Sequence, residues 1–500
     1  MEVVNEARQP QQRSLALDAL RGLSILLMVF ADMMPNGLPS WMYHAQLPPP
    51  ARVFIPTVPG MTWVDLVFPF FLFTMGAAIP LALSRRIEVG FSNWKMIKGL
   101  LFRGFLLAWF AIFFMQVDPF VLSNNPDWKT WLVGLLGFAL LFPVLARLPE
   151  NWSKARRYAV RAVGWGGSII VMALVRFPSG SGFSLYRSDD IIMLLATAAV
   201  FGGFVWLLTR DSWIIRLGIL GILLAFRLSS GGPVWLPDMS RSSQIFVPII
   251  FSTAPSQWLH SLWLISPVPW LFQMRFLQYL FIIIPGTIIG DMILRWMRRS
   301  PAEMSSDTLA WPKSRLFLLS ALMVIISVIV VIGLKAQWVL GTTVITFALL
   351  IAGWSLVAHP VHAAERMINS FFKWGSYWLI LGLMFEPYEG GIKKDPATMS
   401  YYFVASGLAI FILIALTVLV DVLSFKKSMK FLIECGQNPM IAYAAGDILI
   451  APIFGLTGLS IVLKDLTPMP WLGVIGAAVI TSLVAISTVF FTRKKIFLRT

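Results

Sequence analysis

The chain has 500 residues, of which 58% are hydrophobic and 13% are charged. Water-soluble domains contain about 45–50% apolar residues, so the excess here must face lipid. The net charge of +16 would suggest nucleic-acid binding in a soluble protein, but Lys and Arg gather in short clusters between apolar runs, as membrane insertion requires. Four histidines and one cysteine predict neither an intramolecular disulfide nor a structural metal site. We therefore expect an all-α, polytopic transmembrane helix bundle with no nucleic-acid partner.

Apolar runs long enough to cross a membrane recur along the whole chain. A spanning helix needs about 17–25 residues, and we count about fourteen candidates, with twelve as the alternative. They cover residues 15–34, 61–84, 96–117, 131–147, 158–176, 190–209, 213–229, 275–297, 316–334, 338–358, 368–386, 401–424, 438–458 and 471–492. Basic clusters fall in every second loop, with Lys393–Lys394 as the main exception. This alternation predicts an even number of spans and places both termini in the cytoplasm.

Two long loops, residues 35–60 and 230–274, are expected on the outer side of a single membrane domain that covers residues 1–500. The first contains seven prolines, a density that excludes a regular helix and favours a stiff, folded-over loop. The second mixes four tryptophans with prolines, and such aromatics gather where the membrane meets water. We therefore expect the second loop to lie on the membrane surface.

The first span carries a polar stripe on an otherwise apolar helix. Asp18 and Arg21 are three residues apart, so they share one helix face and can pair. Asp32 returns to within about 20° of Arg21's direction and lies about 16 Å further along the axis. A charge in the middle of a membrane costs about 2.5–3.5 kcal/mol, so such a stripe faces protein or water rather than lipid. The alternative for Asp18 and Arg21 is an ion pair at the inner membrane interface.

The next candidates follow in the proline-rich loop and at the start of the second span. His44 lies in the outer loop, and a neutral imidazole there could act as a base or a nucleophile. Asp65 lies in the first turn of the second span, three residues after Thr62. This spacing is typical of a helix-capping pair. The functional alternative is that Asp65 faces the same outer pocket as His44 and Asp32.

Two residues near the C-terminal spans are more ambiguous. Asn438 begins a span, where it could cap the helix or project its amide into the bundle. Cys435 has no adjacent base, so we expect a buried, inert thiol. The terminal RKKIF is most simply a cytoplasmic anchor.

Several of these segments together resemble the heparan-alpha-glucosaminide N-acetyltransferase family. RSLALDALRG, then His44 in a Trp/Tyr-rich loop, then TWVDLVFPFFLFTMG are similar to that family's opening spans. YEGGIKKD, GQNPMIAY and the terminal RKKIF resemble its closing part. The first 86 and the last ~115 residues carry the resemblance, in the same order. In the middle of the chain, the resemblance rests on the hydropathy pattern alone.

The resemblance implies acyl transfer across a membrane, in a bacterial member of the family located in the inner membrane. The donor would be cytoplasmic acetyl-CoA, and the acceptor an amino or hydroxyl group of a sugar or glycan on the outer side. The histidine that matches His44 is regarded as catalytic in that family, either carrying the acetyl group or acting as the general base. The family's TxxDLVFP aspartate matches Asp65. A homodimer is also implied.

The resemblance guides the assignment of roles but departs from the family at one position. An aspartate such as Asp32 could orient the ring of His44, as a triad acid does. The animal members are expected to have asparagine there, and an ionised aspartate cannot donate to an oxyanion. This leaves Asn438 as the candidate oxyanion donor and, with Asp18 and Arg21, part of the acetyl-CoA site. The rival functions are a multi-pass transporter or flippase of an envelope precursor, and a membrane scaffold.

Overall fold

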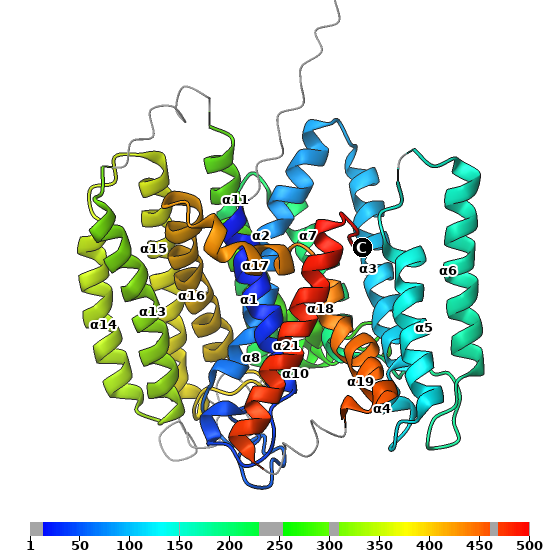
Figure 1. Ribbon diagram of the computed structural model, residues 1–500. Coiled ribbons are helices and arrows are strands. Elements are labelled where there is room, and N and C mark those ends of the chain that lie inside the picture. Colours follow the sequence, from blue (N-terminus) through cyan, green and yellow to red (C-terminus); the bar gives the residue numbers. More distant parts are fainter. Residues whose placement is uncertain (1–13, 150, 230–253, 300–309, 461–468, 500) are drawn as a thin grey trace, which may run out of the picture.

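The computed structural model describes residues 14–149, 151–229, 254–299, 310–460 and 469–499, and these form an all-helical bundle (Figure 1). Ten helical stretches in this part are long and apolar enough to cross a membrane. The protein is therefore an integral multi-pass membrane protein. The stretches are α2 (Trp63–Glu88), α3 (Asn93–Val117), α5 (Trp128–Leu145), α7 (Asp190–Thr209), η2 with α11 (Met274–Met297), α13 (Lys313–Lys335), α14 (Val339–Leu356), α16 with the π-helix η4 (Met399–Val422), α18 with η5 and α19 (Pro439–Thr457), and α21 (Pro470–Arg493).

Four further segments that we expected to span are also helices, but they fall short of the same criterion of length and composition. They are α1 (Leu15–Asp32), α6 (Lys154–Leu174), α8 (Trp213–Ser229) and α15 (Ala363–Phe385). α1 carries three charged residues and α8 has 17 residues, whereas α6 and α15 are less apolar. Figure 1 nevertheless shows α1, α6 and α15 running alongside the ten. The described chain thus supports ten spans by composition and is consistent with a larger even number.

The remaining elements lie between or beside these helices. They are η1 (Ser40–Met42), α4 (Pro119–Leu122), α10 (Ala254–Trp263), η3 (Glu386–Glu389) and α17 (Lys426–Gly436). Residues 35–60 contain η1 and otherwise turns and extended chain, as their proline content predicts. Residues 230–253 of the expected 230–274 loop lie outside the described residues.

The centre of the bundle is formed by α1, α2, α11 and α16. Along α16 the residues from Met399 to Leu416 are almost all buried. α1 and α17 approach closely at glycines: a Cβ at Gly22 would lie 1.9 Å from the Leu432 carbonyl oxygen, and one at Gly436 would lie 1.8 Å from that of Asp18. Small residues at such crossings let helix backbones touch inside membranes. This contact fixes where the polar end of α1 lies.

The two ends of the described chain meet at one end of the bundle. Arg499 donates its backbone N–H to the Leu145 oxygen (3.1 Å), and Arg147 donates to that of Phe497 (3.2 Å). Ser14 and Arg499 both line a single cavity. The segment 33–62, dark blue in Figure 1, lies at the opposite end of the bundle. α1 and α2 therefore connect two chemically different ends of the molecule.

Candidate functional site

The proline-rich segment and the start of α2 are joined by the carboxylate of Asp65. Its Oδ2 accepts hydrogen bonds from the backbone N–H of Thr62 (2.8 Å) and of Ala45 (3.2 Å), and from the Thr62 hydroxyl (3.1 Å). The side chain is 1% exposed. Asp65 thus caps α2, the structural alternative that its spacing allowed. The same bonds leave its second oxygen, Oδ1, directed elsewhere.

That second oxygen contacts His44. Asp65 Oδ1 pairs with Nδ1 of the imidazole, so Asp65 caps α2 and contacts His44 at the same time. A shared pocket that also includes Asp32 stays a prediction. Because a carboxylate only accepts hydrogen bonds, the partner Nδ1 carries the proton and the lone pair is on Nε2. His44 is 28% exposed, in contrast to the buried aspartate. The pair has the arrangement of a base whose ring is oriented by an acid behind it.

Nε2 of His44 faces Lys394, whose Nζ lies 2.6 Å away. Lys394 comes from the loop between η3 and α16, 350 residues along the chain. Burial lowers the pKa of this lysine, while Asp65 and Asp395 act to raise it. Sequence reasoning did not assign Lys394 a function. The signal that could have found it was its violation of the charge alternation, because a basic pair in an outer loop needs a reason other than topology.

Asp32 is located at the C-terminal end of α1, with an exposed side chain. The contact with His44 Nδ1 that we expected of Asp32 is made by Asp65. The charged groups that act on Asp32, or on which it acts, are Arg52, Asp118 and Asp447. A catalytic role for Asp32 stays a prediction.

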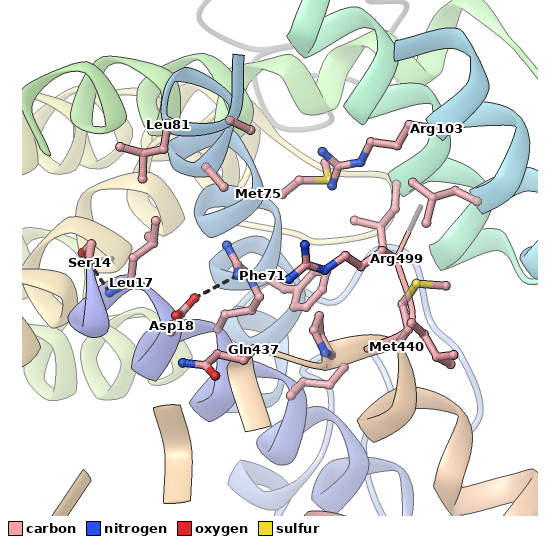
Figure 2. Close-up of a pocket in the computed structure, with 18 of the residues that line it drawn as sticks. Ser14, Leu17, Asp18, Phe71, Met75, Leu81, Arg103, Gln437, Met440 and Arg499 are labelled. Atoms are coloured by element: carbon pink, nitrogen blue, oxygen red, sulfur yellow. Dashed lines mark hydrogen bonds and ion pairs between the residues drawn. The ribbon is translucent and has the colours of Figure 1, made fainter. Parts of the chain in front are cut away.

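The other end of the bundle holds a cavity of about 1260 Å³ with a strongly basic lining. Figure 2 shows Asp18, Arg103 and Arg499 arranged around it. Arg21 donates to Asp18 Oδ1 (3.2 Å) and to the backbone oxygens of Gly436 and Thr74 (both 3.4 Å). The Asp18–Arg21 pair is therefore part of the cavity wall. The charged lining residues are Arg21, Arg85, Arg86, Arg103, Arg298, Arg299, Arg499, Asp18 and Glu88.

The cavity changes character along its length. On α1 it is lined from Ser14 to Met28, about 21 Å at 1.5 Å per residue. On α2 it runs from Glu88 to Phe71, which is six residues, or about 9 Å of helix rise, from Asp65. The cavity is lined mainly by arginines toward the Ser14 end and by Met28 and Phe71 at the far end. Arg21 also reaches the far end, since its Nη2 donates to the Thr74 oxygen. The cavity thus extends toward the His44 end, and His44, Asp65 and Lys394 are not among its lining residues.

Arg103 is the lining residue with the clearest unmet hydrogen-bonding capacity. Its Nε is buried and has no hydrogen-bond partner. A buried donor without an acceptor is costly. Arg103 comes from α3, and Figure 2 shows its guanidinium extending toward the cavity. It is therefore suited to an anionic ligand.

Asn438 has a different position from the one an oxyanion donor needs. Its side chain is fully buried, with Nδ2 donating to the Ile496 oxygen (2.8 Å) and Oδ1 accepting from the Leu498 N–H (3.3 Å). Both ends of the amide are thus engaged by the C-terminal segment, which carries Arg499 into the cavity. A direct contact of Asn438 with the donor stays a prediction, but the residue holds one wall of the cavity.

Other candidates behave as inert or structural groups. Cys435 is buried, and burial raises the pKa of its thiol to about 12, as expected of an unreactive cysteine. Among the described residues, no group of His, Cys, Asp and Glu side chains is arranged to hold a metal ion.

Comparison with known proteins identifies the family. A family model described as Domain of unknown function (DUF5009) matches residues 13–293, more than half of the chain. The chain belongs to this family. This DUF5009 protein is also similar to two curated relatives named heparan-alpha-glucosaminide N-acetyltransferase. It is 32% identical to the Homo sapiens protein over 132 residues and 30% identical to the Mus musculus protein over 130 residues, in each case 26% of this chain.

These matches confirm the resemblance noted from the sequence, at the level of distant and partial similarity. They span 17% and 18% of the two relatives' own lengths. The similarity therefore reaches about a sixth of each mammalian protein.

Proposed function

We propose that this DUF5009 protein is a transmembrane acyltransferase. It takes an acetyl group from acetyl-CoA in the basic cavity and transfers it, at His44, to an amino or hydroxyl group of a sugar or glycan. The observation that carries the proposal is the His44–Asp65 pair at one end of α1 and α2, with a basic cavity reaching toward it from the other end. We infer from the charge alternation that the cavity mouth faces the cytoplasm and that His44 lies on the outer side. The family resemblance implies a bacterial inner membrane.

The cavity suits a donor with an anionic head and a long, thin arm. Guanidinium groups bind phosphate oxygens through paired, charge-assisted hydrogen bonds, and Arg86, Arg103 and Arg499 present such groups. Small-molecule sites usually measure about 300–1,000 Å³, so 1260 Å³ leaves room for a nucleotide cofactor. The part of the cavity lined by Met28 and Phe71 would hold the pantetheine arm. In this arrangement the acetyl group crosses the bundle while the nucleotide stays at the cytoplasmic mouth.

The chemistry at His44 follows from its protonation state. With the proton held on Nδ1 by Asp65, the Nε2 lone pair can attack the thioester carbon or accept the proton of an attacking amine or hydroxyl. In the second route the acceptor's nitrogen or oxygen bonds to the carbonyl carbon, and its proton moves to Nε2. The carbon–sulfur bond then breaks, and the CoA thiolate takes up the proton. Asp65 stabilises the transient imidazolium in that route and keeps the ring oriented in both.

The first test is acetyl-CoA binding and hydrolysis by the purified protein in detergent. Wild type is compared with His44→Ala and with His260→Ala, a matched substitution at a histidine on α10. We expect all three proteins to bind acetyl-CoA, and wild type and His260→Ala to release CoA slowly. His44→Ala should lose that release by a factor of about 10²–10⁴, the usual contribution of a positioned base.

Two outcomes would contradict the proposal. If His44→Ala hydrolyses acetyl-CoA as fast as wild type, His44 is not the reacting group. If none of the proteins binds CoA at micromolar concentration, the donor assignment fails. A transporter of anionic substrates would then explain the basic cavity better, and uptake into proteoliposomes would be the next measurement.

A further inference from the structure

We propose that Lys394 is a catalytic residue of this acyltransferase, with its ammonium group stabilising the oxyanion that forms next to Nε2 of His44. The inference rests on the proposed function and deepens it, because it concerns the oxyanion donor, a role for which the sequence offered Asn438. Acyl transfer places negative charge on the carbonyl oxygen, and a site without a donor there forfeits much of its rate. The geometry points to Lys394 as that donor.

Lys394 lies directly beside the reactive nitrogen of His44. Its Nζ is 2.6 Å from His44 Nε2, so it occupies the space where the reacting carbonyl must arrive. An arriving thioester would displace the ammonium from the lone pair by a change of side-chain rotamer. Because a lysine side chain is long and flexible, its Nζ stays within reach of the carbonyl oxygen after that movement. The contact in the free enzyme thus marks the place of the donor.

The loop around Lys394 is held in place by several hydrogen bonds. Glu389 accepts the backbone N–H groups of Met399 (2.7 Å) and Ser400 (2.8 Å), and so caps α16. The side-chain amide of Gln46 binds both the N–H (2.9 Å) and the carbonyl oxygen of Asp395. Gln46 is two residues from His44 and is buried. These bonds join the two loops that carry His44 and Lys394, so their juxtaposition is held by the backbone.

The other candidate oxyanion donors are bound elsewhere or have the wrong charge. The amide of Asn438 is bound to Ile496 and Leu498. The backbone N–H of Ala45, next to His44, donates to Asp65. Asp32 is a carboxylate and, when ionised, cannot donate. Among the described residues, Lys394 is the cation with a hydrogen bond to the catalytic ring.

The step balances without a further reactant. As the nucleophile bonds to the thioester carbon, the carbonyl π electrons move to oxygen, and an N–H of Lys394 donates to that oxyanion. When the carbonyl re-forms, the carbon–sulfur bond breaks and the electron pair leaves on sulfur. Lys394 keeps its proton throughout. It must therefore be charged while the Nε2 lone pair of His44 is free.

The role of Lys394 predicts that activity decreases at high pH. The titratable groups around Lys394 are His44, Asp65 and Asp395. Near the two carboxylates lie Tyr279, Tyr401 and Tyr402. Activity should be lost as pH rises through the pKa of Lys394, which burial lowers. In Lys394→Arg the guanidinium stays charged, so this alkaline limb should move to higher pH or vanish. A purely structural lysine would leave the limb in place.

The decisive experiment is chemical rescue of Lys394→Cys. The chain contains one cysteine, Cys435, whose burial and high pKa protect it from alkylation. The purified variant is treated with 2-bromoethylamine, which restores a side chain ending in an ammonium group, or with iodoacetamide, which adds a neutral amide. Wild type receives both treatments as the control. We expect Lys394→Cys to bind acetyl-CoA and to lose about 10²–10³ in kcat, the typical cost of one oxyanion donor.

The outcomes separate this inference from the proposed function. Recovery of at least tenfold with 2-bromoethylamine but not with iodoacetamide supports Lys394. Wild-type activity in untreated Lys394→Cys, or equal recovery with both reagents, overturns its role while leaving His44 untouched. If Lys394→Cys does not fold, Lys394→Arg decides, and an unmoved alkaline limb in that variant overturns the role. Loss of the difference between wild type and His44→Ala would instead overturn the proposed function itself.

Discussion

Two clusters in this protein each combine a buried basic side chain with an aspartate, but we assign them different roles. In the first, Arg216 on α8 pairs with Asp291 on α11 (2.7 Å). In the second, His44 and Lys394 gather around Asp65. Each cluster ties together helices that are distant in sequence. They differ in how completely their hydrogen-bonding groups are used.

In the Arg216 cluster, each nitrogen of the guanidinium has a hydrogen-bond partner. The guanidinium is fully buried and donates to the Thr209 hydroxyl (3.1 Å), the Thr209 carbonyl (3.2 Å) and the Thr287 hydroxyl (3.0 Å), while the second Asp291 oxygen accepts from Trp206 Nε1 (2.9 Å). In the His44 cluster, a hydrogen bond joins Nε2 of His44 to Nζ of Lys394 at a partly exposed position. A satisfied network stabilises a fold, whereas a base next to a displaceable donor is prepared to react.

The largest expected effect is loss of activity in Asp65→Asn. An amide keeps the size of the carboxylate but can donate to His44 Nδ1, so it favours the tautomer with the proton on Nε2 and abolishes the base. In a related triad arrangement the same change costs about 10⁴ in kcat. We expect the transfer rate at neutral pH to fall by about 10³–10⁴-fold, while acetyl-CoA binding is retained. Stopped assays of CoA release alongside calorimetric binding would measure both.

Replacing the carboxylate of the Arg216 cluster should lower the stability of the protein and leave its activity unchanged. Asp291→Ala leaves Arg216 buried without its counter-charge, which typically costs about 3–5 kcal/mol. We expect a lower unfolding midpoint in detergent and a normal kcat per folded molecule. A midpoint equal to that of wild type, or a kcat that falls as in Asp65→Asn, would contradict the contrast between the two clusters.

A smaller effect is expected at the cavity. Arg103→Met removes a buried guanidinium whose Nε has no protein partner while keeping an apolar side chain of similar length. One lost phosphate contact of about 1.4 kcal/mol weakens binding tenfold. We expect about that rise in KM for acetyl-CoA, an unchanged kcat and little loss of stability. Arg157→Met, at a position on α6 that does not line the cavity, is the matched control.

The smallest effect is expected from Asn438→Ala. This change releases the C-terminal segment from two hydrogen bonds, each contributing about 0.5–1.5 kcal/mol, and so loosens the wall that carries Arg499. We predict a rise of a few-fold in KM for acetyl-CoA with kcat preserved. A fall in kcat at constant KM would instead restore Asn438 as an oxyanion donor and weaken the case for Lys394.

Local sequence features predicted much of what the structure contains. Each of the fourteen expected segments is helical, because an apolar run inside a membrane must satisfy its backbone within itself. The Asp18–Arg21 pair and the capping of α2 by Asp65 follow from spacings of three residues on a helix. The sequence also pointed to His44, through its place between two motifs.

The parts that sequence reasoning missed depend on contacts between distant segments. Asp32 was expected behind the imidazole because it lies on the polar stripe of α1, yet the fold of residues 33–62 brings His44 onto Asp65 instead. Asn438 was proposed as a helix cap or as an amide that projects into the bundle, and nothing local indicates that its amide binds residues 496 and 498. Lys394 was noted as a charge out of place and given no function.

Composition, hydropathy and charge alternation by themselves determined the class of this protein, its helices and the proposed sidedness, because these depend on how single segments partition between water and lipid. The tertiary structure alone decided which carboxylate orients His44, which cation faces its reactive nitrogen, and that seven arginines from different segments surround one cavity. Those arrangements arise from side-chain packing between residues up to hundreds of positions apart, and hydropathy carries no record of such packing.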